Sequence, residues 1–256
     1  LDDMRLIKDG GEQATMLRAA CISARAHERA MRATRPGMYE YEIEAELLHE
    51  FRRSGAQAPA YTPIVATGAN ACVLHYVANN AQCRDGDLVL IDAGCEFDSY
   101  ASDITRTYPV NGRFSAPQRA LYELVLAAQA AALSAIRPGA LYTGMHDAAV
   151  HVLAQGLLDL GLLGKATFGS AENVVAERAH LPFYMHGTGH WLGLDVHDVG
   201  AYRDVKAEGK PSRPLQAGMV VTVEPGLYVR PGPGVPEQFW HLGIRIEDDI
   251  AVTADG

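Results

Sequence analysis

The fold is decided by residues 87–110, DLVLIDAGCEFDSYASDITRTYPV. Two runs of strand-forming residues flank a polar break, so the stretch predicts an antiparallel hairpin. If Asp92 faces Asp103, the turn lies between Phe97 and Asp98, where the apolar pattern stops. Facing side chains in such a hairpin have Cβ atoms about 5 Å apart. Two carboxylates so close in an apolar setting repel each other, and a bound cation would relieve that repulsion.

A similar arrangement recurs later in the chain. Residues 217–229, AGMVVTVEPGLYV, and residues 241–252, HLGIRIEDDIAV, have the composition of strands and flank a loop rich in Pro and Gly. If Glu224 faces Glu247, the turn lies at residues 235–236, inside that loop. A single acidic residue at a strand end is usually a cap or a surface residue. Two such pairs predict that four carboxylates converge on one site.

The rest of the chain divides into two similar halves. Apolar spacing and Pro-Gly stops predict two helices in each half, over residues 12–33, 39–53, 117–136 and 142–162. Each pair of helices precedes a short strand and a hairpin; in the first half the short strand is 73–77, which carries His75. The acidic residues of 39–53 are expected on a solvated face. We therefore expect an α+β fold of two pseudo-symmetric helix-helix-hairpin halves, about 12–112 and 116–252, with a shared antiparallel sheet and the helices outside it.

Composition limits the classes of function. The 256 residues, 48% hydrophobic and 21% charged, suit one large soluble domain. The net charge of −9 argues against nucleic acid or an anionic membrane as a partner. No apolar run approaches the roughly 20 residues of a membrane span. The four cysteines form no C-x-x-C pair and are expected in the core, which favours a reducing compartment, so we expect a cytoplasmic protein.

The four carboxylates carry too much charge for one ion, so we expect two divalent cations. Two such ions lie about 3.5–4 Å apart and can share a hydroxide that is usable at neutral pH. His190, which corresponds in the second half to His75 in the first, is the natural nitrogen ligand. An oxygen-rich set with one imidazole favours Mn²⁺, Co²⁺ or Zn²⁺. Arg245, two residues before Glu247 on the same strand face, is expected to support a carboxylate or to contact substrate.

Four of the ten histidines are expected near the strand ends that carry the carboxylates: His75, His186, His190 and His197. A lone histidine is more often structural, but this grouping favours a site. His186 and His190 have the i, i+4 spacing of a zinc-binding helix. Pro182 and Gly187 oppose a helix there, so we do not interpret these two histidines as a helical ligand pair.

These motifs resemble the catalytic domain of bacterial Xaa-Pro aminopeptidases (aminopeptidase P), of the pita-bread metallopeptidase family. The resemblance covers nearly the whole chain and rests on LHY (74–76), DGDLVLIDAGCE (85–96), SDITRTYPVNG (102–112), HWLGLDVHDVG (190–200), VEPGLY (223–228) and GIRIEDD (243–249). It implies that residues 1–256 are a single catalytic domain with a curved, shared sheet. Full-length relatives carry an N-terminal domain that is absent here, so we expect a fragment of a protein that forms a homo-oligomer, a dimer or tetramer.

The resemblance also implies a site and a substrate. The metal ligands are Asp92, Asp103, His190, Glu224 and Glu247, with Asp103 and Glu247 bridging two ions, most often Mn²⁺. The substrate is a peptide with an N-terminal Xaa-Pro sequence. A bridging hydroxide attacks the carbonyl of its first bond, and Glu247 accepts the proton. His75 and His197 hold the amide and the tetrahedral intermediate, His186 lines the proline pocket, and Arg245 supports Glu247 and the pocket.

Three alternative functions belong to the same fold. Prolidase, which cleaves Xaa-Pro dipeptides, is the nearest. Methionine aminopeptidase shares the five ligands, although His186 and His197 favour the proline-specific branch. A non-catalytic binding module is a different class, and such modules have lost ligands that this chain keeps. GTG at 187–189 is smaller than the residues expected between these histidines, which would change the rim of the pocket.

Overall fold

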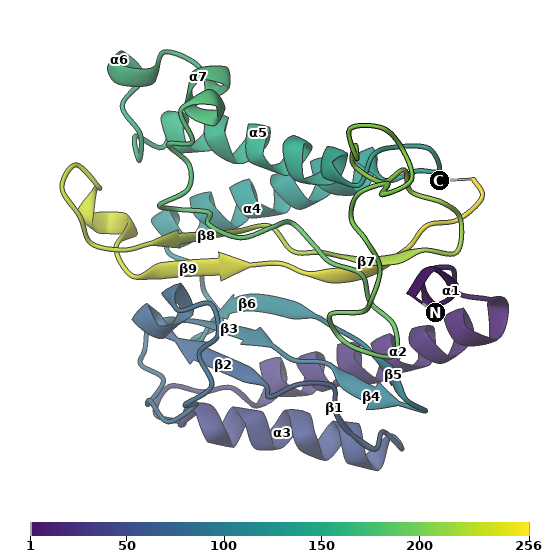
Figure 1. Cartoon of the computed structure of the whole chain (residues 1–256). Coiled ribbons are helices and arrows are strands. Elements are labelled where there is room, and N and C mark those ends of the chain that lie inside the picture. The colour runs from purple at the N-terminus through teal and green to yellow at the C-terminus, as the bar shows by residue number, and fades with distance from the viewer. Residues whose placement is uncertain (1, 256) are drawn as a thin grey trace.

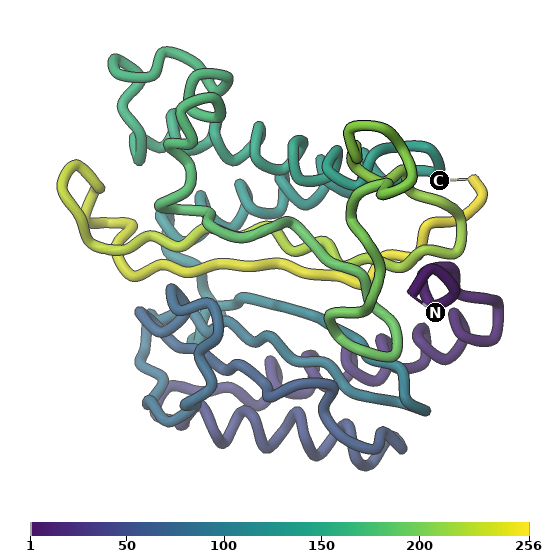
Figure 2. The backbone as a smooth tube through the Cα atoms, in the orientation of Figure 1, coloured from purple at the N-terminus to yellow at the C-terminus, as the bar shows by residue number. Residues whose placement is uncertain are grey.

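The molecule consists of antiparallel strands enclosed by two pairs of helices (Figure 1). The computed structural model describes residues 2–255. Helices α4 and α5 lie on the outer side of the strands of the second half, and α2 and α3 lie on the outer side of those of the first half. The backbone trace shows the strands of the two halves side by side between the helix pairs (Figure 2). This architecture confirms the expected α+β class.

Four long helices match the predicted ranges to within three residues at each end. The helices of residues 2–255 are α1 (Asp2–Leu6), α2 (Gly10–Ala33), α3 (Glu40–Arg53), α4 (Ala116–Ala135), α5 (Thr143–Asp159), α6 (Lys165–Phe168) and α7 (Ala171–Ala176). A capping box starts α2: the Asp9 side chain accepts from the Glu12 backbone, and the Glu12 side chain accepts from the Asp9 backbone. The first turn of α4 contains Pro117, as expected. Helices α1 and α6 were not predicted, because they are too short to show a helical period.

The hairpin at 87–110 is present, and it lies in two small antiparallel sheets. The strands of the first half are β1 (Ala58–Pro59), β2 (Ile64–Thr67), β3 (Leu88–Asp92), β4 (Cys95–Phe97), β5 (Tyr100–Ala101) and β6 (Thr105–Pro109). Strand β3 pairs with β2 and β6, and β4 pairs with β1 and β5. Strand β3 is buried from Leu88 to Ile91, so this hairpin lies in the interior of the first half.

The register of this hairpin differs from the prediction by two residues. Asp92 pairs with Thr105, not with Asp103, which lies in the break between β5 and β6. The turn lies at Asp98 and Ser99, whose φ angles of 48° and 70° fit the two-residue turn of a hairpin. Continuing the register places Asp103 opposite Gly94, where a Cβ atom would lie 1.7 Å from the carbonyl oxygen of Ser102. Because the error is two residues, both aspartates still point to the same face of the hairpin.

The second hairpin has the predicted register. Its strands are β7 (Val220–Val223), β8 (Gly226–Val229), β9 (Leu242–Arg245) and β10 (Asp248–Ala251). Gly226 pairs with Arg245 and Val223 pairs with Asp248, so Glu224 and Glu247 are opposite each other between these pairs. Asp103 and Glu247 therefore do not hold equivalent places in the two hairpins. The internal duplication of the chain stays a prediction.

The two halves meet along β6 and the segment from β9 to β10. Thr105 and Glu247 form an antiparallel bridge, and the Thr107 hydroxyl donates to the Arg245 carbonyl at 3.0 Å. Each half has its own apolar core, one beneath α2 and α3 and one beneath α4 and α5. A smaller cluster contains both Leu90 of β3 and Tyr228 of β8. The shared sheet is thus joined by a short contact at its centre, next to the predicted site.

Three local expectations need correction. Residues 73–77 do not form a strand; His75 lies in a turn. The acidic residues of α3 do not all lie on a solvated face, because Glu40 is completely buried. Of the four cysteines, all free, Cys21 is exposed and only the other three belong to the interior. None of the helices in residues 2–255 is long and apolar enough to cross a membrane.

Candidate metal centre

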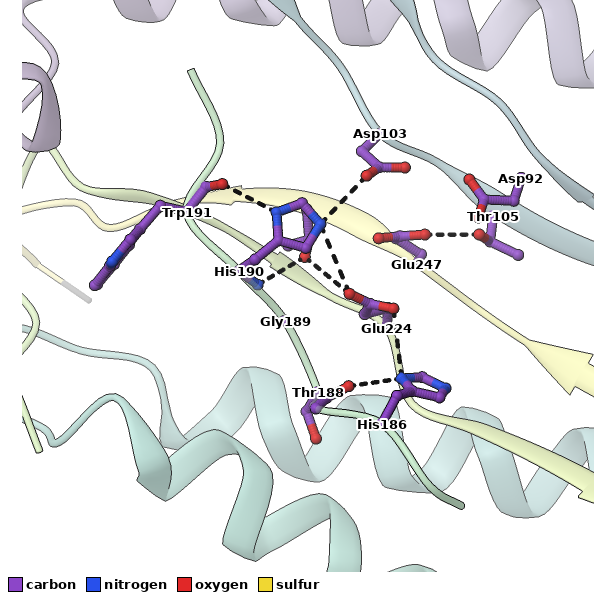
Figure 3. Close-up of polar contacts among 12 residues, drawn as sticks. Asp92, Asp103, Thr105, His186, Thr188, Gly189, His190, Trp191, Glu224 and Glu247 are labelled. Atoms are coloured by element: carbon purple, nitrogen blue, oxygen red, sulfur yellow. Dashed lines mark hydrogen bonds and ion pairs between the residues drawn. The ribbon is translucent and has the colours of Figure 1, made fainter. Parts of the chain in front are cut away.

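Four carboxylates converge where the strands of the two hairpins break (Figure 3). Asp92 is the last residue of β3 and Asp103 precedes β6, while Glu224 follows β7 and Glu247 precedes β10. One ligand atom from each of Asp103, His190 and Glu247 lies within 4.8 Å of the others, a spacing that suits a metal ion.

The position of His190 is determined by hydrogen bonds to its backbone and to the far side of its ring. Its backbone N–H donates to the Thr222 hydroxyl at 3.1 Å. Its Nδ1 donates to the carbonyl of Trp191 at 2.9 Å, which leaves Nε2 directed at the carboxylates. Nε2 lies 3.4 Å from Asp103 Oδ2 and 3.7 Å from Glu224 Oε1. This tautomer and orientation are those of a histidine metal ligand.

The charges of the centre are unbalanced. Burial and the charge of Asp92 raise the pKa of Asp103, and burial with the charge of Asp103 raises the pKa of Glu247 well above its usual range. Burial also raises the pKa of Glu224, to about 7. Burial lowers the pKa of His190, but its hydrogen bond to Asp103 and the charges of Asp103 and Glu224 together outweigh this and raise the pKa to about 9. Four converging carboxylates outnumber the positive charges beside them, so the donor set fits divalent cations.

Side chains behind the carboxylates hold them in place. The Tyr61 hydroxyl donates to Asp92 Oδ1 at 2.6 Å and lies within hydrogen-bond distance of Asp103 Oδ1 as well. The Thr105 hydroxyl donates to Glu247 Oε2 at 2.6 Å. Because Tyr61 has one hydroxyl proton, it can donate to only one of the two aspartates at a time.

Arg245 is buried and contacts several parts of the centre. It donates to Asp92 Oδ2 at 2.6 Å, to the Tyr228 hydroxyl at 2.8 Å and to the Thr105 hydroxyl at 3.2 Å. The expected support of Glu247 by Arg245 is therefore indirect, because Thr105 lies between them. The direct carboxylate partner of the guanidinium is Asp92.

Three further histidines surround the carboxylates. His186 Nε2 accepts from the Tyr228 hydroxyl at 2.8 Å, and Nδ1 donates to the Gly187 carbonyl at 2.7 Å. The rings of His190 and His197 lie 4.2 Å apart, edge to face. Burial lowers the pKa of His186 to about 3, and burial with the charges of His190 and His75 lowers the pKa of His197. His186 and His197 are therefore neutral near pH 7.

A single cavity of about 410 Å³ brings the predicted site together. All nine predicted residues line it: His75, Asp92, Asp103, His186, His190, His197, Glu224, Arg245 and Glu247. Leu74, Gly187, Gly189 and Tyr202 complete the lining. None of the sequence-predicted site residues lies elsewhere.

The loop between His186 and His190 is not helical, as expected. A Cβ atom at Gly189 would lie 2.0 Å from the carbonyl oxygen of Thr222, so only glycine permits this approach. Thr188 is buried and hydrogen bonds to Tyr184 and His146, at 2.7 and 2.8 Å. The small residues thus serve close packing beneath the loop, and Gly187 and Gly189 also reach the cavity.

Sequence reasoning missed the hydroxyl groups of the site, on Tyr61, Thr105, Thr222 and Tyr228. Thr105 and Thr222 each lie two residues from a predicted ligand, so strand periodicity places them on the same face as Asp103 and Glu224. That signal was available. No spacing in the sequence connects Tyr61 with Asp92.

The family model of the metallopeptidase family M24 matches residues 14–254 of the chain. The chain belongs to this family. The M24 fold explains the paired hairpins and the carboxylates at their breaks, and the resemblance to pita-bread metallopeptidases is confirmed.

Relatives of this M24 chain include the Xaa-Pro aminopeptidases of Haemophilus influenzae and Escherichia coli. Each is 51% identical, over 100% and 99% of this chain but only 57% and 56% of the relative. The chain thus spans somewhat more than half the length of these relatives. Pseudomonas aeruginosa aminopeptidase PepP has a TM-score of 0.95 at 53% identity, covering 99% of this chain and 56% of that one. E. coli aminopeptidase P with the inhibitor Pro-Leu has a TM-score of 0.93 at 50% identity, covering 99% and 56%.

Proposed function

We propose that residues 1–256 form the catalytic unit of an aminopeptidase that cleaves the first peptide bond when proline is the second residue. The observation that carries the proposal is that all nine residues predicted from the sequence line one cavity. The relatives named Xaa-Pro aminopeptidase, at 51% identity across the whole chain, support the same activity.

Two divalent cations, Mn²⁺ most readily and Co²⁺ or Zn²⁺ as alternatives, suit the donor set. Asp103 and Glu247 would be shared between the ions, His190 and Glu224 would complete one, and Asp92 would complete the other. When bound, such a pair supplies a hydroxide at neutral pH and polarises a carbonyl group. Glu247 would accept the proton of the attacking water, and the hydrogen bond from the Thr105 hydroxyl to its Oε2 supports this role by holding the carboxylate in one orientation.

His75 and His197 would act on the substrate rather than on the ions. Both line the cavity. A neutral imidazole, which the lowered pKa of His197 provides near pH 7, can donate one N–H to the oxygen that gains charge in the transition state. His186, held by Tyr228, and Arg245 would form the wall beside the proline ring.

The chemistry of the substrate suits such a site. An Xaa-Pro bond is a tertiary amide without an N–H group. A peptidase that recognises its substrate through that N–H cannot bind this bond. A site that polarises the carbonyl, beside a pocket shaped for a ring, does not need it.

The test combines metal content with peptide cleavage. We expect the chain, supplied with Mn²⁺, to release the first residue from Xaa-Pro peptides, and Glu247→Ala to lower kcat/KM by at least about 10³-fold. Glu237→Ala, an exposed glutamate of the loop before β9, is the matched control and should leave activity unchanged. Cleavage that survives Glu247→Ala, or that persists in metal-free protein, would contradict the proposal.

Substrate length separates the proposed activity from that of a prolidase. We expect a longer Xaa-Pro peptide to be cleaved with a higher kcat/KM than an Xaa-Pro dipeptide. The reverse order would assign the chain to the dipeptidase alternative and leave the metal chemistry intact.

A further inference from the structure

Glu40 is a buried carboxylate outside the metal centre. It is the first residue of α3 and is 0% exposed. Among residues 2–255, no Lys, Arg or His side chain forms an ion pair with it. A buried carboxylate is costly unless hydrogen bonds satisfy it. Its place at the start of a helix, where backbone N–H groups create positive potential, helps to stabilise the charge.

Four donors satisfy Glu40, and all four come from one loop. Oε1 accepts from the Thr67 backbone at 2.7 Å and from the Asn70 side chain at 3.1 Å. Oε2 accepts from the Tyr76 hydroxyl at 2.8 Å and from the Ala81 backbone at 2.8 Å. One side chain therefore fixes both ends and the middle of the segment 67–81, which we call the His75 loop.

The His75 loop has other anchors on either side of His75, at Cys72 and Asn79, but few next to His75 itself. It contains a short 3-10 helix (Gly68–Cys72), but residues 73–81 form no helix or strand. Val73 and Val77 are 50% and 54% exposed, so the apolar packing of this part is limited to Leu74 and Tyr76. The Asn79 side chain donates to Glu44 of the same helix at 2.9 Å and to the Pro63 carbonyl at 2.8 Å. It also accepts from the Val65 backbone at 3.0 Å, so Asn79 is a second polar anchor. Loops with few buried contacts open readily unless specific bonds prevent it.

His75 lies between these anchors. It is exposed, lines the metal-centre cavity and is the direct neighbour of Tyr76. We propose that Glu40 is a positioning residue for His75: by holding the His75 loop against α3, it sets where the imidazole stands relative to the carboxylates. The catalytic part of this role rests on the proposed function, in which His75 contacts the substrate.

A carboxylate is required at this position because all its partners are donors. Glutamine would present an NH₂ group to two of the four donors, and aspartate is one methylene shorter. A misplacement of about 1 Å in a group that contacts the transition state can lower a rate by about 10²-fold. We therefore expect Glu40→Gln to lower kcat and kcat/KM together by 10- to 100-fold.

A double-mutant cycle separates positioning from general destabilisation. If Glu40 acts through His75, Glu40→Gln should change kcat/KM less than twofold in a His75→Ala background. A fall of the same size in both backgrounds would overturn the proposal. Glu46→Gln, a half-exposed glutamate of the same helix that pairs with Arg29, is the matched control and should leave activity unchanged.

A second measurement does not depend on activity. Hydrogen exchange at residues 73–81 should be at least tenfold faster in Glu40→Gln, with exchange in α4 and α5 unchanged; unchanged exchange at 73–81 would overturn the anchor. If Glu40→Gln does not fold, Tyr76→Phe, which removes one of the four donors, decides the same comparisons with a smaller effect of about threefold or more. If the wild-type chain cleaves no Xaa-Pro peptide, the proposed function fails, and hydrogen exchange still decides whether Glu40 anchors the loop.

Discussion

Thr105 and Glu247 join the two halves of the molecule twice, by an antiparallel backbone bridge and by a hydrogen bond of 2.6 Å between their side chains. Thr105 faces Asp92 in the first hairpin, and Glu247 faces Glu224 in the second. The bridge therefore sets the distance between the two carboxylate pairs. The Thr105 hydroxyl also accepts from Arg245, so it links the guanidinium to Glu247.

Thr105→Val should remove this link while keeping the shape of the side chain. We expect metal affinity to fall about 10- to 100-fold, the usual effect of losing a group that orients a ligand. Calorimetric titration with Mn²⁺ measures it. Thr105→Ser keeps the hydroxyl and should keep most of the affinity; unchanged affinity in Thr105→Val, or an equal loss in both variants, would contradict the role given to the hydroxyl.

Tyr61→Phe tests the hydroxyl that is shared by Asp92 and Asp103. Without its proton, the two carboxylates of the metal-free protein are left to repel each other, and we expect a loss of about 1–3 kcal/mol in the free energy of unfolding. Urea unfolding of the metal-free protein measures this. In saturating Mn²⁺ the difference should become smaller, because the cations replace the proton as the partner of the carboxylates. A loss that does not depend on metal would contradict this explanation.

The sequence predicted which face of a hairpin a side chain lies on better than it predicted which residue is opposite on the neighbouring strand. The second hairpin has the predicted register, since its long Pro/Gly-rich loop leaves the strands free to align by their apolar pattern. The first differs by two residues, because the turn needs positive φ at Asp98 and Ser99 and because Gly94 admits the close carbonyl of Ser102. An error of two keeps the face, so the carboxylate cluster was predicted correctly from a wrong pairing.

The polar interior of the site could not be predicted in the same way. Glu40 occurs in EYEIEAE, a pattern typical of a solvated helix face, and its burial depends on a loop that begins 27 positions away at Thr67. The hydrogen bond from the Tyr61 hydroxyl to Asp92 joins residues that are 31 positions apart. Periodicity describes local geometry, whereas these contacts depend on how the loops fold over the hairpins. The predicted metal ligands were easier to find, because acidic residues are unusual within apolar strands.

The metal-free protein should lose stability as the pH rises above about 6.5, where buried histidines of lowered pKa, such as His186, are mostly neutral in the folded and unfolded states alike. The pKa of His190 is raised to about 9, above the value of about 6.5 expected in the unfolded chain, so its stabilisation is complete below pH 6.5 and disappears by about pH 9. The pKa of Glu224 is raised from 4.5 to about 7, so its ionisation destabilises the fold increasingly across that interval. Both groups bind more protons in the folded state than in the unfolded state, so each lowers the stability of the fold as the pH rises.

Thermal unfolding between pH 6.5 and 9 measures this dependence. We expect the Tm of the metal-free protein to fall over that interval and the Mn²⁺-loaded protein to show a much smaller fall, because the cations take the place of the protons. In the metal-free state, His190→Gln should remove the share of the fall in Tm that His190 causes between pH 6.5 and 9. A metal-free Tm that rises with pH would be inconsistent with the charge imbalance described for the centre.

The buried ion pair between Lys8 and Asp198 should stabilise the segment that carries His197. Lys8 Nζ lies 3.1 Å from Asp198 Oδ2, and the two side chains are 2% and 1% exposed. Removing one partner of a buried pair typically costs about 3–5 kcal/mol. Arg5 also contacts Asp198, so we expect Lys8→Met to cost less, about 2 kcal/mol in urea unfolding.

The double variant Lys8→Met with Asp198→Asn should recover part of that loss, because no unpaired charge stays buried. Lys206→Met, which breaks an exposed pair with Asp3, is the control and should change stability by less than about 0.5 kcal/mol. Since His197 precedes Asp198, kcat/KM for an Xaa-Pro peptide should fall in Lys8→Met while Mn²⁺ affinity stays the same. A fall in metal affinity of the same size would show that the pair supports the whole centre rather than the position of His197.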